Sequence, residues 1–211
     1  STAPNTDSIG VFMRATRSGI IRNNVIEGGE ASTAAAIYVQ EITESTTDPL
    51  ISNNTINASG AFSSRGIYLW GPTTPVIENN IISASRGTTR QYCIDENNVA
   101  ADPASLRNNV LFDCATALYR DELTTEITAI GDVNNLAGTD ASGNISLDPV
   151  FVDRDGVDND LTTLADNDWR LSAGTPASVS EGGLDLSAEF ELDLEGKTRT
   201  VNWSIGAYER D

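Results

Sequence analysis

The stretch Ile20-Ile21-Arg22-Asn23-Asn24-Val25-Ile26 decides the fold, because close copies of it follow along the chain. The copies are Leu50-Ile51-Ser52-Asn53-Asn54-Thr55-Ile56, Val76-Ile77-Glu78-Asn79-Asn80-Ile81-Ile82, Ser105-Leu106-Arg107-Asn108-Asn109-Val110-Leu111 and a weaker Asp132-Val133-Asn134-Asn135-Leu136. The second asparagine recurs at positions 24, 54, 80, 109 and 135, so the spacings are 30, 26, 29 and 26 residues. Repeats of this length indicate one structural unit that is stacked on copies of itself.

A second phrase keeps step with the first. Its copies are Gly10-Val11-Phe12-Met13-Arg14, Ala36-Ile37-Tyr38-Val39-Gln40, Gly66-Ile67-Tyr68-Leu69-Trp70, Gln91-Tyr92-Cys93-Ile94-Asp95 and Ala117-Leu118-Tyr119-Arg120-Asp121. The apolar runs of both phrases are short, rich in β-branched residues and broken by Asn, Gly, Ser and Thr. Such runs are typical of strands joined by turns rather than of helices.

The paired asparagines predict a sharp corner between two strands, because asparagine tolerates the left-handed backbone region. Stacked corners would let each side chain hydrogen-bond to the next one, about 4.8 Å away. We therefore predict an all-β fold, a right-handed parallel β-helix of about five coils with three short strands in each coil. Residues 1–144 are expected to form the coils, and residues 145–211 the final coil and a C-terminal cap of the same domain.

The composition excludes several classes of function. The 211 residues include 31 acidic and 13 basic residues, a formal net charge of −18, which argues against nucleic acid and anionic membranes as partners. The absence of histidine excludes histidine bases and ligands, and two cysteines cannot form a tetrahedral cysteine site. No apolar run approaches the roughly 20 residues of a membrane span. An acid-rich chain with a single lysine, Lys197, fits a marine or saline source.

The repeats resemble the parallel β-helix repeat proteins of bacteria, in the pectate-lyase-like superfamily, many of which are secreted and have no assigned activity. The stretch Asn144-Ile145-Ser146-Leu147-Asp148-Pro149-Val150-Phe151-Val152-Asp153 is similar to the family's run that closes the last coils. Residues 155–160, 168–177 and 196–199 and the phrase Ile205-Gly206-Ala207-Tyr208-Glu209 resemble its usual C-terminal region. The resemblance implies a bacterial protein that is extracellular or lies at the cell surface.

The beginning of the chain departs from this family's pattern. The family's coils normally start behind a capped N-terminus, whereas here a strand phrase starts at Ile9. An open coil is an exposed sheet edge, which proteins usually cover. We expect either the N-terminal remainder of a larger chain or a packing partner at this end.

The outward side chains of the second phrase form the candidate site. Strand residues alternate between two faces, so positions three and five of each copy should point outward. One outward stack is expected at Phe12, Tyr38, Tyr68, Cys93 and Tyr119, and another at Arg14, Gln40, Trp70, Asp95 and Asp121. In polysaccharide-acting members of the fold, a groove over this strand holds the sugar chain, and aromatic rings stack on sugars. The predicted substrate-binding residues are Tyr38, Tyr68, Trp70, Gln40 and Tyr119, although stacked rings can equally serve only to stabilise neighbouring strands.

A catalytic site is the alternative interpretation of the same face. Asp95 and Asp121 would lie on neighbouring coils, and glycosidases use two carboxyl groups about 5–5.5 Å or 6.5–9.5 Å apart. A lyase could instead use Arg14 as its base, with Ca²⁺ neutralising the uronate. Solvated acids on an acidic protein are the competing interpretation. Arg120 is expected to point inward and to pair with an acid of the C-terminal cap.

An acidic turn is the candidate metal site. Asp153, Asp155, Asp158 and Asp160 surround Gly156, and oxygen ligands spaced around a glycine turn can hold a structural Ca²⁺. The spacing is not that of an EF-hand, and a solvated acidic loop is the alternative.

The cysteines and two tryptophans receive structural predictions. A disulfide between Cys93 and Cys114 would require the intervening loop to curl back, so free thiols are favoured. Trp169 and Trp203 are expected to be buried in strands that cover the open end of the helix.

Three functions follow from these features. The first is a non-catalytic extracellular module that binds polysaccharide along the aromatic face. The second is a polysaccharide lyase or glycoside hydrolase acting in the same groove. The third is a structural fragment of a larger surface protein.

Overall fold

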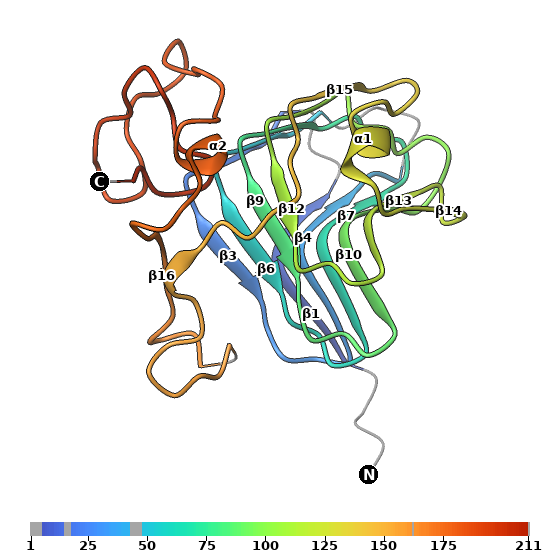
Figure 1. Ribbon diagram of the computed structural model, residues 1–211. Helices are drawn as coiled ribbons and strands as arrows, with labels where there is room; N and C mark the ends of the chain where they lie inside the picture. Colours follow the sequence, from blue (N-terminus) through green and yellow to red (C-terminus); the bar gives the residue numbers. More distant parts are fainter. Residues whose placement is uncertain (1–5, 15–17, 43–47, 162, 211) are drawn as a thin grey trace.

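The computed structural model describes residues 6–14, 18–42, 48–161 and 163–210, which form a stack of β-strand coils and a C-terminal region (Figure 1). Four coils have three strands each. In chain order these are β1 (Asp7–Arg14), β2 (Ile20–Arg22), β3 (Val25–Gly28), β4 (Thr33–Gln40), β5 (Leu50–Ser52), β6 (Thr55–Ala58), β7 (Ser63–Trp70), β8 (Val76–Glu78), β9 (Ile81–Ala84), β10 (Arg90–Glu96), β11 (Ser105–Arg107) and β12 (Val110–Phe112).

Corresponding strands of successive coils pair in parallel and form three sheets. Sheet A has the order β1-β4-β7-β10-β13-β14, sheet B the order β2-β5-β8-β11-β15, and sheet C the order β3-β6-β9-β12. The side chains inside the stack form one apolar core, in which Ile37, Ile51, Ile56 and Ile67 are fully buried. This arrangement confirms the predicted parallel β-helix.

The fifth coil is partial and differs from the prediction. It consists of β13 (Ala117–Asp121), the antiparallel β14 (Thr125–Ile127), the short helix α1 (Ile130–Val133) and β15 (Asp140–Ser142). Its corner is formed by Gly143 and Asn144, not by Asn134 and Asn135 as the weak fifth copy suggested. Gly143 has a φ of +66° and so takes the left-handed position that an asparagine holds in the other coils.

The two asparagines of each corner have different roles. The first, at positions 23, 53, 79 and 108, has φ between 51° and 56°, so the left-handed backbone turns the chain. The second donates from Nδ2 to Oδ1 of the next corner. Asn24 donates to Asn54 (3.0 Å), Asn54 to Asn80 (3.0 Å), Asn80 to Asn109 (3.0 Å), Asn109 to Asn144 (2.9 Å) and Asn144 to Asn134 (2.8 Å). The predicted ladder is therefore confirmed, and it continues through the fifth coil to α1.

The C-terminal region lies along the outside of the stack. It contains β16 (Phe151–Asp153), β17 (Asp168–Leu171) and α2 (Ala177–Ser180), and it runs beside sheet C (Figure 1). Leu171, Val179 and Ile205 bury the outward side chains of Ile81 and Val110 in a second apolar cluster.

The first asparagines of the corners hold this region in place through Nδ2. They donate to backbone oxygens as follows: Asn23 to Leu192 (2.6 Å), Asn79 to Leu184 (2.9 Å) and Asn108 to Gly182 (2.7 Å). Trp169 and Trp203 are buried as expected, but at this side contact. The prediction that their segments cover the open end of the helix was wrong, because the apolar outer face of sheet C and the polar corner provide the partner surface instead.

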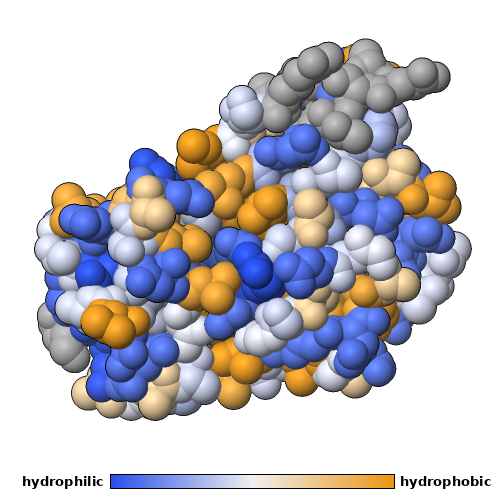
Figure 2. Space-filling model, turned by 90° about the horizontal axis from the view of Figure 1, so that it is seen from above, coloured by the Kyte–Doolittle hydropathy of each residue, from blue (hydrophilic) through white to orange (hydrophobic). Residues whose placement is uncertain are grey.

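The two ends of the stack differ. At the fifth coil, α1 lies over the core, with Val133 fully buried and Ile130 packed beside it. At the first coil, β1, β2 and β3 are the outermost strands of their sheets. On the face shown in Figure 2, apolar side chains lie in small groups separated by hydrophilic ones. None of the helices in the described ranges is long and apolar enough to cross a membrane.

Candidate functional site

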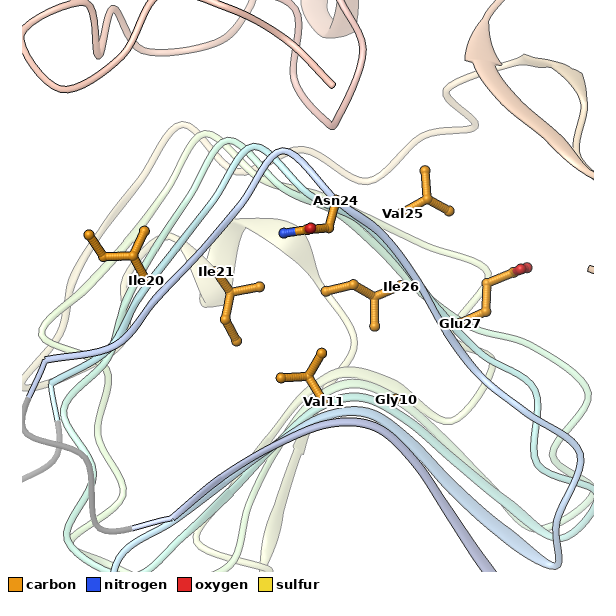
Figure 3. A pocket seen from close by; sticks show the side chains of 8 residues that line it. All are labelled: Gly10, Val11, Ile20, Ile21, Asn24, Val25, Ile26 and Glu27. Carbon is orange, nitrogen blue, oxygen red and sulfur yellow. The ribbon is translucent and has the colours of Figure 1, made fainter. Parts of the chain in front are cut away.

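Sheet A bends toward the core, and its outer surface is therefore concave. The bend lies at the register position of Gly10 and Val11 (Figure 3), where two consecutive residues face the interior. In the fourth coil these residues are Cys93 and Ile94, both fully buried. The inner position of the bend requires a small side chain, since a Cβ on Gly66 would approach Ile82 to 2.4 Å.

Two outward rows flank this bend. One row contains Phe12, Tyr38, Tyr68, Asp95 and Arg120. The other contains Ile9, Ala35, Arg65, Tyr92 and Ala117. Together these two rows form the concave face of sheet A.

The predicted register was wrong by two residues in the fourth coil and by one residue in the fifth. Asp95 pairs with Tyr68, not with Trp70, and Tyr119 pairs with Ile94. A shift of one residue exchanges the two faces of a strand. Cys93 takes the small-residue position of the bend, and this sets the register. Tyr119 is consequently buried in the core, and its predicted role in substrate binding is withdrawn.

The first three coils have the predicted outward aromatic row. The ring centroids of Phe12 and Tyr38 are 5.1 Å apart, and those of Tyr38 and Tyr68 are 4.8 Å apart. Gln40 donates from Nε2 to the Tyr38 hydroxyl at 3.1 Å, and Trp70 lies beside Gln40 in the register. Arg14 occupies the same register position in β1 and is exposed.

A hollow of about 200 Å³ lies next to these rings on the concave face. Its lining comes from the first three coils: Asp7, Ser8, Ile9, Thr33, Ala35, Tyr38, Arg65 and Tyr68. The guanidinium of Arg65 lies 4.7 Å from the centre of the Tyr68 ring. The hollow therefore combines aromatic faces with a cation and hydroxyl groups.

A buried ion network continues the row of rings. Asp95 has no exposed side-chain surface and lies 2.5 Å from Arg65 Nε and 2.6 Å from Arg120. Burial raises the pKa of Asp95, and the two guanidinium groups oppose this rise. Arg120 also lies 4.5 Å from the centre of the Tyr92 ring, and the Tyr92 hydroxyl donates to Glu126 at 2.7 Å.

Sequence reasoning missed this network because it depends on the register. Arg120 was expected to face inward and to pair with an acid of the C-terminal cap, but it lies on the outward row and pairs with Asp95. Arg65 and Tyr92 belong to the second outward row. Strict alternation along the repeated phrase does not predict that these two side chains point outward. The available signal was Arg65 itself, a charged residue directly before Gly66, which indicates an outward position.

The predicted catalytic carboxylates do not face each other. Asp95 of β10 pairs in register with Arg120 of β13. Asp121 follows Arg120 in β13 and therefore lies opposite Glu96. Glu96 is buried on the inner face and accepts a hydrogen bond from the Tyr119 hydroxyl. Burial, together with the Asp121 and Asp102 carboxylates, raises the pKa of Glu96 to about 9. Glu96 is therefore protonated at neutral pH and belongs to the core.

Cys93 and Cys114 form a disulfide, so the expectation of free thiols was wrong. The shift of register places Cys93 inside the bend, and Cys114 is buried just after β12. Their Cα atoms are 5.5 Å apart, within the distance that a disulfide spans.

The acidic turn between β16 and β17 forms no metal cluster within the described ranges. No group of three or more acidic or cysteine side chains is arranged there to hold an ion. The backbone N–H of Asp160 instead donates to two acceptors, the Asp158 carboxylate at 2.9 Å and the carbonyl oxygen of Asp155. Calcium binding by Asp153, Asp155, Asp158 and Asp160 stays a prediction, which melting with calcium and with a chelator tests.

The coil architecture, the corner ladder and the concave outer sheet define a β-helix protein. The family model for the right-handed β-helix region matches residues 1–135 of the chain. The chain therefore belongs to this family. Searches of curated proteins and of solved structures each found no match.

Proposed function

We propose that this protein is a non-catalytic, secreted or cell-surface module that binds polysaccharide along the concave face. The observation that carries the proposal is the row of Phe12, Tyr38 and Tyr68. Their rings follow one another at 5.1 and 4.8 Å along the axis of the stack. Phe12 is 49% exposed although it is a large apolar side chain. An extended sugar chain offers a series of apolar ring faces that suits such a row.

Polar groups beside the rings support binding of hydroxyl-rich ligands. Arg65 and Ser8 line the hollow next to Tyr38, and Gln40 and Arg14 lie along the same edge. Such groups can bond sugar hydroxyls or carboxylates while the rings hold the apolar faces. The Cys93–Cys114 disulfide supports an oxidising compartment, in keeping with a secreted protein.

Catalysis on this face has less support. Both oxygens of Asp95 accept hydrogen bonds from guanidinium groups, and its side chain is fully buried. A general acid or nucleophile must reach the substrate. Asp121 does not pair with Asp95, so the two-carboxylate arrangement of a glycosidase is not assembled.

The test is binding of soluble polysaccharides, neutral xylan and anionic polygalacturonate, measured by affinity gel electrophoresis. Phe12→Ala should weaken binding at least fivefold, which corresponds to a loss of about 1 kcal/mol. Phe62→Ala is the matched control. Phe62 is 50% exposed, close to the 49% of Phe12, but it lies outside the aromatic row. Equal effects of the two variants would refute the assignment of the concave face.

A further inference from the structure

The first coil leaves three strand edges and a hollow of mixed polar and apolar lining uncovered within the described part of the chain. β1, β2 and β3 each end their sheet. The hollow, of about 480 Å³, is shown in Figure 3. Its lining includes Val11, Ile21 and Ile26, and Ile20 at its rim is 62% exposed. Unpaired strand edges are places where another strand adds.

We infer that this end binds the same end of a second copy of the chain, which forms a head-to-head dimer with a two-fold axis. The other end is a poorer partner surface, because α1 packs against its core and the edge strand of sheet A there is the antiparallel β14. The surface that offers complementary edges is therefore another first coil. A two-fold axis pairs a surface with itself and makes the facing strands antiparallel.

Charge complementarity along β1 supports this arrangement. When the axis passes between Gly10 and Val11, Asp7 lies opposite Arg14 of the partner subunit. Asp7 and Arg14 are both exposed and both lie on the outward face, as the hollow beside Tyr38 and the charge of Arg14 near the Tyr38 hydroxyl indicate. Because the pair occurs twice, the dimer gains two opposite-charge contacts. All eight residues of β1 are paired in this register.

The same axis also matches the other two strands. Figure 3 shows Asn24 at the corner across the core from Gly10 and Val11, with Ile20 and Ile21 on one side and Val25 and Ile26 on the other. Rotation about a line joining the bend and this corner therefore lays β2 of one copy on β3 of the other. Ile21 then faces Ile26 of the partner subunit, and the two cores meet.

The charge balance of this end permits such contact. The strands β1, β2 and β3 carry two acidic and two basic residues, Asp7, Glu27, Arg14 and Arg22. The whole chain has 31 acidic and 13 basic residues, so most of its surface would repel a second copy. The first coil is electrically balanced and so avoids this repulsion.

Sedimentation equilibrium at moderate salt tests the inference. The wild-type chain of 22.4 kDa should sediment at twice that mass at high concentration. Arg14→Asp places two carboxylates opposite each other and should raise the dimer dissociation constant at least tenfold. Asp7→Arg combined with Arg14→Asp exchanges the charges and should restore the dimer.

Circular dichroism and the melting midpoint establish that each variant is folded. A wild-type chain that stays monomeric at all concentrations would overturn the inference. So would a dimer that Arg14→Asp leaves intact, because the contact would then lie elsewhere. Failure of the double variant to recover would exclude the antiparallel register of β1.

Discussion

Asn79 and Leu184 bond to each other twice, although they are 105 residues apart in the chain. The Nδ2 of Asn79 donates to the carbonyl of Leu184 at 2.9 Å, and the N–H of Leu184 donates to Asn79 Oδ1 at 2.7 Å. Asn79 also turns the corner of the third coil with φ of 56°. One side chain thus serves both the coil and the attachment of the C-terminal region.

Asn79→Gly should remove the attachment and keep the corner. Glycine accepts positive φ without strain, as Gly143 does at the equivalent position of the fifth coil. The loss of two partly buried bonds should lower the free energy of unfolding by about 1–3 kcal/mol. Urea unfolding measures this difference. An unchanged midpoint would mean that the two bonds between Asn79 and Leu184 do not contribute to the attachment of the C-terminal region.

Asn80→Ala should destabilise the protein through the inner ladder. The Nδ2 of Asn80 donates to Ile51 O, Glu78 O and Asn109 Oδ1 at 2.8–3.0 Å, and its Oδ1 accepts from Asn54. Leaving these buried groups without a partner should cost about 1–3 kcal/mol or more.

Asn24→Ala is the matched control for this variant. Asn24 belongs to the same ladder but is only half-buried at its first corner. It should lose less stability than Asn80→Ala in the same thermal melt. Equal losses would show that burial does not determine the strength of the ladder.

Glu96 should make stability fall as the pH rises. Its folded pKa of about 9 lies above the ordinary value of 4.5, so the folded state favours the protonated form. The associated stability is fully present below pH 4.5 and is lost as the pH rises toward 9, by up to about 1.4 kcal/mol per pH unit.

Glu96→Gln keeps the shape of the side chain and removes its titration. The variant should lose less stability than the wild type between pH 5 and pH 9, as followed by urea unfolding at several pH values. Parallel pH profiles for the two proteins would mean that Glu96 ionises without cost.

Reduction of the Cys93–Cys114 disulfide should lower the free energy of unfolding. The bond closes a loop with a sequence separation of 21 residues, for which chain entropy predicts about 3 kcal/mol. Melting curves with and without reductant measure the effect, and mass spectrometry verifies the reduction. The doubly substituted Cys93→Ala, Cys114→Ala chain should melt like the reduced protein. If the reduced chain keeps the midpoint of the oxidised one, the bond does not constrain the fold.

The fold could be predicted because its signals are local and repeated. Asn24, Asn54, Asn80 and Asn109 mark corners wherever they occur, and β-branched residues mark the strands beside them. The outward aromatic row of Phe12, Tyr38 and Tyr68 followed from alternation in three coils with matching phrases.

The remaining features depended on packing between segments. The bend in sheet A makes two consecutive residues face the core, so simple alternation fails across it. Cys93 fits the small position of the bend, which moved Asp95 from the row of Trp70 to the row of Tyr68. The one-residue shift in β13 turned Arg120 outward and placed it beside Asp95. The C-terminal region found its surface on the outer side of sheet C, a contact between distant segments that no local pattern marks.

Size-exclusion chromatography of the wild-type protein with neutral and anionic polysaccharides, with Ca²⁺ present, tests the proposed function most directly. The protein should elute together with at least one polymer, and that polymer should keep its length. Shortening of the polymer would contradict the proposed function and show an enzyme. Separate elution from every polymer would also contradict it and favour a purely structural role.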